Sequence, residues 1–264
     1  MSEPTYRVYA LRYATRDARR QDHFIGGDPH DAPMPMDYFV WAAVNGERAI
    51  IIDTGFTAEV AARRKRDYLR CPVDSLKLIG VDPDMVEDVI ITHLHYDHVG
   101  SFHKFAKARF HLQEAEMHYA CGHFMKHKRL RHSFEVEDVV GIVRMTYADR
   151  TVFHMGDGEV TPGITLHAVG GHSAGLQCVR VNTQRGPVVL ASDVTHFYEN
   201  MEAGRPFTTC FHVGLMLDGF DRLRALAPSA RHIVPGHDPE VMRRYPAAPE
   251  LEGIAVELHR EPSA

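Results

Sequence analysis

The stretch THLHYDHVG places four potential metal ligands within six positions: His93, His95, Asp97 and His98. His93 and His95 follow an apolar run and are two positions apart, and side chains with this spacing in an extended chain point the same way. Both imidazoles can therefore reach one ion, while a turn at Gly100 would direct Asp97 and His98 towards a second ion. Imidazole and carboxylate groups are the ligands of zinc and similar divalent metals.

Three further candidate ligands each follow a short apolar segment. His172 lies in GGHS, Asp193 ends VVLASD, and His237 lies in HIVPGHD. The ends of neighbouring strands gather at one edge of a sheet, where loops carry functional side chains. We therefore expect these residues to join the first motif in one metal centre.

The elements that must position these ligands can be read from the pattern of apolar residues. Segments rich in β-branched and aromatic residues predict strands within residues 5–14, 37–44, 48–55, 84–92, 108–113, 163–171, 176–183, 186–193 and 231–238. Helical spacing predicts helices at 57–70 and 213–227, with irregular helical structure over 113–147. Strands in both halves with helices between them favour an α/β fold of four layers, an αββα sandwich, over a doubly wound parallel sheet. No repeat or linker divides residues 1–264, so one domain is expected.

Composition limits the classes of function. The chain has 264 residues, 44% of them hydrophobic and 25% charged, which is typical of a soluble globular enzyme. No apolar run is long enough to span a membrane, and the first residues do not resemble a secretory signal, so a cytoplasmic location and no membrane partner are expected. The net charge of −5 argues against a nucleic-acid partner. The four cysteines form no C-x-x-C pair and are expected to be reduced and inert.

The order H-x-H-x-D-H, His, Asp, His resembles that of the metallo-β-lactamase superfamily over essentially the whole chain. The resemblance extends to IIDTG, which ends at Gly55. It implies the αββα sandwich with a dinuclear metal site at one edge. It assigns His93, His95 and His172 to one metal, assigns Asp97, His98 and His237 to the other, and lets Asp193 bridge both. Asp53 would orient ligands, although a purely turn-forming role is an equal alternative.

Within that superfamily, the segment ASDVTHFYENM and the lengths between ligands resemble the N-acyl homoserine lactone lactonases, which quench quorum sensing. Those enzymes commonly carry a Tyr three residues after the bridging Asp, near the substrate carbonyl. This chain has His196 at that position and Tyr198 two residues later. Either side chain is a candidate donor of the same hydrogen bond. The resemblance implies a lactonase acting on an N-acyl homoserine lactone or a related lactone. The alternative is a thioester hydrolase of the glyoxalase II type, or another ester or cyclic-amide hydrolase on the same site.

The expected mechanism uses two divalent metal ions, with zinc favoured and manganese, cobalt or iron able to take the same ligands. A hydroxide between the ions is expected to attack the carbonyl. The resemblance further implies that Asp97 passes a proton to the leaving oxygen. Phe24, Met34 and Met36 are candidate contacts for an apolar tail of a lactone or ester substrate. The basic stretch at 125–132 is interpreted as a solvated helix face, with capture of an anionic substrate as an alternative. A homodimer is suggested by analogy with relatives.

Overall fold

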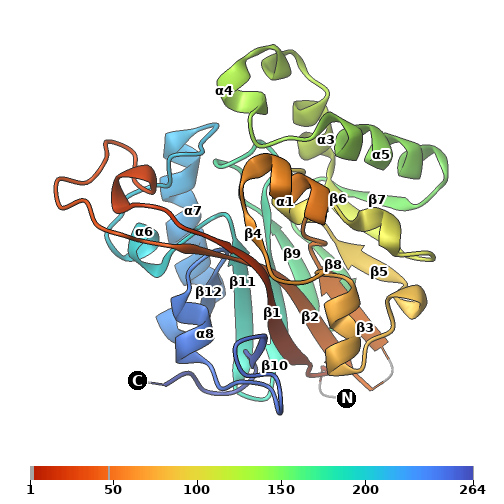
Figure 1. Ribbon diagram of the computed structural model, residues 1–264. Coiled ribbons are helices and arrows are strands. Elements are labelled where there is room, and N and C mark those ends of the chain that lie inside the picture. The colour runs from red at the N-terminus through yellow and green to blue at the C-terminus, as the bar shows by residue number, and fades with distance from the viewer. Residues whose placement is uncertain (1–2, 47, 264) are drawn as a thin grey trace.

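The structure is a computed structural model that describes residues 3–46 and 48–263, and it contains two β-sheets packed face to face (Figure 1). The first sheet runs in the order β13 (Ala255–Glu257), β1 (Arg7–Arg16), β2 (Met36–Asn45), β3 (Arg48–Ile52), β5 (Asp88–Ile90), β6 (Arg109–Gln113) and β7 (Thr151–His154), with β4 (Asp67–Tyr68) paired to β1. The second sheet runs in the order β12 (Ile233–Pro235), β11 (Gly186–Ser192), β10 (Gln177–Thr183), β9 (Ile164–Ala168) and β8 (Gly158–Thr161).

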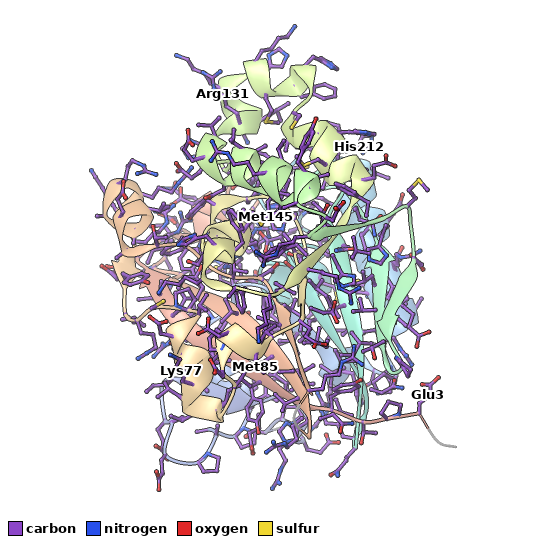
Figure 2. All side chains as sticks on the ribbon, turned by 90° about the vertical axis from the view of Figure 1, so that its right-hand side faces the viewer. Glu3, Lys77, Met85, Arg131, Met145 and His212 are labelled. Atoms are coloured by element: carbon purple, nitrogen blue, oxygen red, sulfur yellow. The ribbon has the colours of Figure 1, made fainter. Side chains whose placement is uncertain are left out.

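Helices cover the outer faces of both sheets, which gives the four layers expected from the sequence (Figures 1 and 2). The helices are α1 (Ala58–Arg64), α2 (Tyr96–Val99), α3 (Glu114–Ala120), α4 (Lys128–Arg131), α5 (Val136–Tyr147), α6 (Tyr198–Glu202), α7 (Val213–Leu226) and α8 (Glu240–Arg244). Met145 of α5, labelled in Figure 2, packs against the apolar cluster on the outer side of the first sheet. Phe220 and Leu223 of α7 pack in the cluster on the outer side of the second sheet.

Strand β2 shows why the sheets lie in the middle of the molecule. Trp41 and Ala43 point into the cluster between the two sheets, whereas Val40 and Ala42 point into the cluster beneath the outer helices. Successive side chains of a strand face opposite sides, so a strand that is apolar at nearly every position needs cover on both faces. The run FVWAAV meets that requirement and therefore fits a central strand of a sandwich.

The helix predicted over residues 57–70 is wrong in its length. Thr57 caps the helix by accepting a hydrogen bond from the backbone N–H of Val60, but α1 ends at Arg64. Lys65 then adopts a left-handed conformation with φ of 56°, which stops the helix. The chain continues into β4, where Tyr68 pairs with Ala14 of β1 and packs against the core. Tertiary pairing therefore overrides the good helix formers of this segment.

The predicted ligands sit where strands of both sheets end. β5 of the first sheet leads into the segment that carries His93 to His98, and the connection between β9 and β10 carries His172. Asp193 directly follows β11, and His237 follows β12, which runs parallel to β11. The site is therefore built from both halves of the sandwich. Among the residues described, no helix is both long and apolar enough to cross a membrane.

Candidate metal centre

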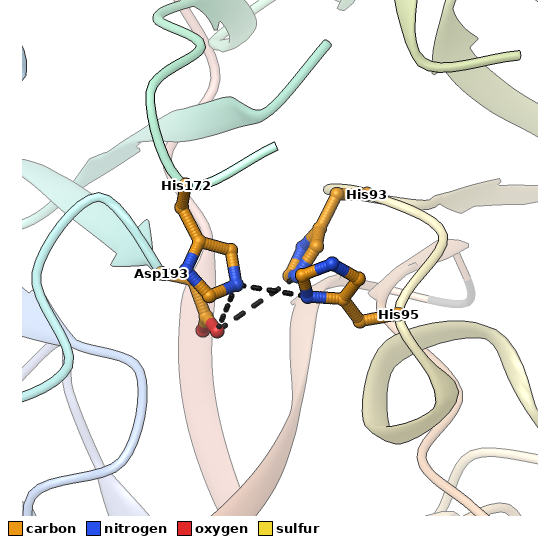
Figure 3. A group of neighbouring side chains, drawn as sticks. All are labelled: His93, His95, His172 and Asp193. Carbon is orange, nitrogen blue, oxygen red and sulfur yellow. Dashed lines mark hydrogen bonds and ion pairs between the residues drawn. The ribbon is translucent and has the colours of Figure 1, made fainter. Parts of the chain in front are cut away.

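The first group of candidate ligands converges as the sequence predicts. Figure 3 shows His93 and His95 facing His172 and Asp193 across a small gap. His95 Nδ1 lies 3.0 Å from His93 Nε2 and 2.9 Å from His172 Nε2. Asp193 Oδ2 is 3.1 Å from His172 Nε2. These separations are close to those between ligand atoms that surround one zinc ion at about 2.0–2.1 Å.

The second group lies directly beside the first and also includes Asp193. His98 Nε2 is 3.3 Å and His237 Nε2 is 3.1 Å from Asp193 Oδ1. Asp97 is the third member, with carboxylate oxygens 3.9 Å from His98 Nε2 and 3.8 Å from His237 Nε2. The two oxygens of Asp193 thus face different groups, which is the arrangement a bridging carboxylate requires.

Hydrogen bonds outside these groups orient three of the imidazole rings. The Nδ1–H of His237 donates to the carbonyl oxygen of Asp37 at 2.9 Å, and that of His172 donates to the carbonyl oxygen of Thr209 at 2.8 Å. The Nδ1–H of His98 donates to the Asp53 carboxylate at 2.7 Å. In each ring this tautomer leaves the Nε2 lone pair directed at the centre, as metal-binding histidines require.

Asp53 combines the two alternatives that its sequence context left open. It turns the chain with a positive φ of 62°, and its buried carboxylate also accepts hydrogen bonds from the backbone N–H and the hydroxyl of Thr92, at 2.7 and 2.8 Å. Because Thr92 precedes His93, and because Asp53 also holds His98, one carboxylate fixes both ends of the motif. Asp53 is therefore a turn residue whose side chain orients candidate ligands.

Glu116 is a second supporting carboxylate, and sequence reasoning missed it. It is fully buried on α3, where its two oxygens accept the backbone N–H groups of Leu94 at 3.0 Å and Gly175 at 2.8 Å. Leu94 lies between His93 and His95, and Gly175 closes the loop that carries His172. Nothing near Glu116 in the sequence marks this role, because its partners come from two distant loops.

The protonation states of the candidate ligands depend on their burial and on one another's charges. Burial and neighbouring imidazoles hold the pKa values of His93 and His95 well below the usual value, so both rings are neutral and keep their lone pairs. Burial opposes the ionisation of Asp193, but the histidines around it, His196 and His237 first, bring its pKa well below the usual range. Asp193 therefore stays a carboxylate.

His98 differs from His93 and His95 in the direction of its pKa shift. Burial would lower the pKa of His98, but the charges of Asp193 and Asp53 outweigh it and raise that pKa well above the usual value. Without a metal ion, His98 therefore supplies the positive charge that a bound cation would replace.

Buried polar atoms without hydrogen-bond partners are a second indication that these residues fit divalent metal ions. His98 Nε2 and Asp193 Oδ1 are both buried, and neither has a hydrogen-bond partner among the residues described. Buried polar atoms without partners are costly, and a metal ion would satisfy both at once. All seven predicted ligands lie in groups that could hold an ion. His93, His95, His172 and Asp193 form one group and Asp97, His98 and His237 a second, while Asp193 and His237 form a third with His196.

The two candidates for the role of the family tyrosine have different positions. His196 lies at the centre, with Nε2 3.0 Å from Asp193 Oδ2 and its ring stacked on Phe207 at 3.6 Å. Tyr198 begins α6 and packs into the core between the sheets, with the Arg244 guanidinium 3.8 Å from its ring centroid. Tyr198 does not line the cavity above the centre. The start of α6 turns its side chain away from the centre, so of the two candidates His196 is the one that lies beside the candidate ligands.

A cavity of about 520 Å³ opens above the centre. Met36 and His196 line it, as predicted for substrate contacts, and so do Arg129 and His132 from the basic stretch at 125–132. The other two predicted contacts lie outside the lining of this cavity. Phe24 is fully buried beneath Arg205, whose guanidinium lies 4.0 Å from the ring centroid, and Met34 packs against the apolar cluster that contains Met36 and Phe207.

Tyrosines unnoticed in the sequence also contribute to this region. Tyr38 lines the cavity and packs edge-on against His237, with ring centroids 5.2 Å apart. The buried Tyr13 hydroxyl donates to the backbone carbonyl of Asp97 at 3.0 Å. Both residues lie on strands β1 and β2, whose alternation places every second side chain on this face. Because these strands are mostly apolar, nothing in their sequence indicates that the two tyrosines lie beside the candidate ligands.

The comparisons with known proteins agree with this geometry. The sequence pattern of the metallo-beta-lactamase superfamily matches residues 34–237. An N-acyl homoserine lactonase of Bacillus sp is 32% identical over 180 residues, which are 67% of this chain and 66% of that protein. The chain thus matches just under two thirds of that relative's length. The N-acyl homoserine lactonase AttM of Agrobacterium fabrum is 27% identical, over 93% of this chain and 98% of its own.

A solved structure has the same fold. The crystal structure of a quorum-quenching N-acyl homoserine lactone lactonase superposes with a TM-score of 0.75 and 24% sequence identity. The superposition covers 90% of this chain and 95% of that one. The four-layer arrangement predicted from the order of strands and helices is therefore confirmed.

Proposed function

Because this chain belongs to the metallo-β-lactamase superfamily, we propose that it is a metal-dependent hydrolase that opens a lactone ring. The observation that carries this proposal is the convergence of five imidazoles and two carboxylates in two adjacent groups at the base of an open cavity. The similarity to N-acyl homoserine lactonases supports a lactone, a cyclic carboxylic ester, as the substrate. The proposal treats residues 1–264 as one domain.

In this proposal each group of side chains holds one ion, and Asp193 contacts both. The ligands of one ion are His93, His95 and His172, and those of the other are Asp97, His98 and His237. Zinc is the favoured metal because neutral imidazole and carboxylate suit it, and manganese, cobalt and iron accept the same ligands. When bound, such ions polarise a carbonyl group and lower the pKa of water to about 7, so that hydroxide is available near neutral pH.

The chain's own residues then orient the substrate and move the proton. The cavity admits the ester from the side lined by Met36 and Tyr38. His196 lines the cavity beside the centre, and in this proposal its Nε2–H, which lies 3.0 Å from Asp193 Oδ2, donates to the carbonyl oxygen when substrate is bound. The Asp97 side chain is 11% exposed, so its carboxylate can receive a proton from water and return it to the leaving alkoxide.

Replacement of His196 tests the assignment of the hydrogen-bond donor. We expect His196→Phe to lower kcat roughly 100-fold, the usual effect of losing one donor to a developing oxyanion. Metal content should stay at two ions per chain, since His196 is not among the seven proposed ligands. Inductively coupled plasma mass spectrometry and steady-state kinetics on the same preparation measure both. Loss of one ion would instead make His196 a ligand, a role that its position beside Asp193 and His237 permits.

The proposed function is tested with purified protein of known metal content. A pH-indicator assay compares lactones, thioesters, β-lactams and phosphodiesters. We expect lactone turnover that disappears after chelation and returns with two equivalents of zinc. Turnover of thioesters or phosphodiesters without lactones would contradict the proposal, and so would lactone turnover that survives removal of all metal.

A further inference from the structure

We propose that the natural lactone carries an anionic group, a carboxylate or a phosphate, which Arg16 and Arg66 bind beside the metal centre. This inference rests on the proposed function and narrows its substrate class. It follows from the side chains that line the cavity. They are mostly polar, whereas a long acyl chain would need apolar contacts.

The cavity is lined almost entirely by polar side chains. Only three lining residues lack a polar side-chain group: Ala18, Met36 and Phe207. Phe207 is already covered by the stacked ring of His196. Sites for apolar ligands are usually lined mainly by hydrophobic and aromatic side chains, because burial of apolar surface supplies the affinity. This cavity offers an aliphatic chain little surface to bury.

Arg16 is a cation without a counter-charge. It is the last residue of β1, is half-buried, and lines the cavity. Its Nε is buried and has no hydrogen-bond partner within residues 3–46 and 48–263. A buried guanidinium donor without an acceptor is costly unless a ligand supplies one. Arg12 on the same strand also has a buried Nε without a partner among the described residues, but its Nη1 forms an ion pair with Asp37 at 3.2 Å, whereas no such pair is found for Arg16 there.

Arg66 is a second cation of the same wall and is held in place by neutral acceptors. Its Nε donates to the Tyr96 hydroxyl at 3.1 Å, and its Nη1 donates to the backbone carbonyl of Arg64 at 2.7 Å. These bonds orient the guanidinium without neutralising it and leave Nη2 for a ligand. Tyr96 directly precedes Asp97, so Arg66 is fixed close to the proposed metal ligands.

Both guanidinium groups line the same cavity as Tyr38. The Tyr96 hydroxyl, which accepts the hydrogen bond from Arg66, lies 3.4 Å from the Tyr38 hydroxyl. Tyr38 packs against His237, so an anion between these arginines would lie next to the centre. Paired guanidinium groups favour carboxylate and phosphate because their forked N–H groups match two oxygens.

The other charges around the cavity fit this assignment. Arg129 also lines the cavity and donates to the backbone carbonyl of Thr208, but it is exposed, so water screens its charge. Arg64 is already neutralised by Glu135 at 2.7 Å. The two acids outside the centre, Asp17 and Asp22, are exposed at the rim, where water screens them. The half-buried wall therefore carries net positive charge in a chain whose total charge is −5.

The test compares pairs of lactones that differ only in charge. One pair is a γ-butyrolactone bearing a ring carboxylate and its carboxamide; the other is gluconolactone 6-phosphate and gluconolactone. We expect the metal-loaded enzyme to prefer one anionic member by at least about tenfold in kcat/KM, and the pair that shows this identifies carboxylate or phosphate. Arg16→Gln should lower kcat/KM for that anionic lactone roughly 10- to 100-fold, mainly through KM, and leave its neutral partner almost unchanged.

Arg16→Gln is the main variant because Arg16 makes no bond whose loss would disturb the fold, and Arg66→Gln is the second. Arg131→Gln is the matched control, since Arg131, labelled in Figure 2, is on α4 like Arg129 but does not line the cavity. Competitive inhibition by tetrahydrofuran-2-carboxylate, which has no ester to hydrolyse, reports binding alone and should weaken in Arg16→Gln.

The outcomes separate this inference from the proposed function. Equal turnover of charged and neutral lactones, with no effect of Arg16→Gln, would overturn the anionic substrate and leave the lactonase intact. Absence of turnover for all four lactones and for an N-acyl homoserine lactone, with two metal ions bound, would overturn the proposed function itself. A preference that Arg131→Gln lowers as much as Arg16→Gln would show a general charge effect, which also contradicts specific binding.

Discussion

Asp193→Asn is expected to lower kcat/KM for a lactone by about 1000-fold or more and to reduce the bound metal from two ions to one or none. Asp193 contacts both groups of candidate ligands, so its loss weakens both sites. Metal ions supply several kcal/mol of transition-state stabilisation, and each 1.36 kcal/mol corresponds to a factor of ten. Steady-state kinetics and metal analysis of the same preparation measure the two effects.

The Asn side chain has the same shape, so the fold should persist in this variant. Circular dichroism and thermal melting of the metal-free protein verify that point. Asp221→Asn is the control, because Asp221 is an exposed residue of α7 that pairs only with Arg224. An Asp193→Asn protein that retains two tightly bound ions and more than a tenth of the activity would show that Asp193 is not the shared ligand.

Asp53→Ala should destabilise the metal-free protein by about 3–5 kcal/mol, the cost of leaving a buried charged partner without its counterpart. His98 and Thr92 both lose their partner in this variant. Metal affinity should fall about 10- to 100-fold, as it does when a group that orients a metal ligand is removed. Urea unfolding without metal and competition with a chelator give the two numbers.

Asp53→Gly separates the role of the backbone from that of the carboxylate. Alanine is strained at the φ of 62° found here, whereas glycine adopts this conformation freely. If the carboxylate matters, Asp53→Gly will lose nearly as much metal affinity as Asp53→Ala. Recovery of wild-type metal affinity in Asp53→Gly would mean that only the turn matters, and that the hydrogen bond to His98 is dispensable.

The residues that the sequence located correctly share a simple property: each follows a short apolar segment. His172, Asp193 and His237 could be found because a strand places whatever follows it at the edge of a sheet, and the chemistry of the side chain then stands out. The fold was equally accessible, because strands such as β2 are apolar on both faces and need two covered sides.

What the sequence could not indicate depends on contacts between distant segments. Strand β13 has only three residues, and pairing with β1 at the other end of the chain defines it. Glu116 and Tyr13 are fixed by backbone groups far away in sequence. Spacing alone also does not reveal that α6 starts at Tyr198 and that its side chain packs into the core. Strands β7 and β8 also lacked a strong apolar pattern.

Because the candidate ligands come from both sheets, the order in which the sheets form limits when the ions can bind. His93 to His98 belong to the half of the chain that leaves the ribosome first, whereas His237 follows β12, which can join the second sheet only beside β11. Each nascent chain must therefore pack both sheets before either ion has all its ligands. Metal uptake is then a late event of biogenesis, and the newly made apoprotein must remain folded without it, held by the apolar layer that its two sheets share.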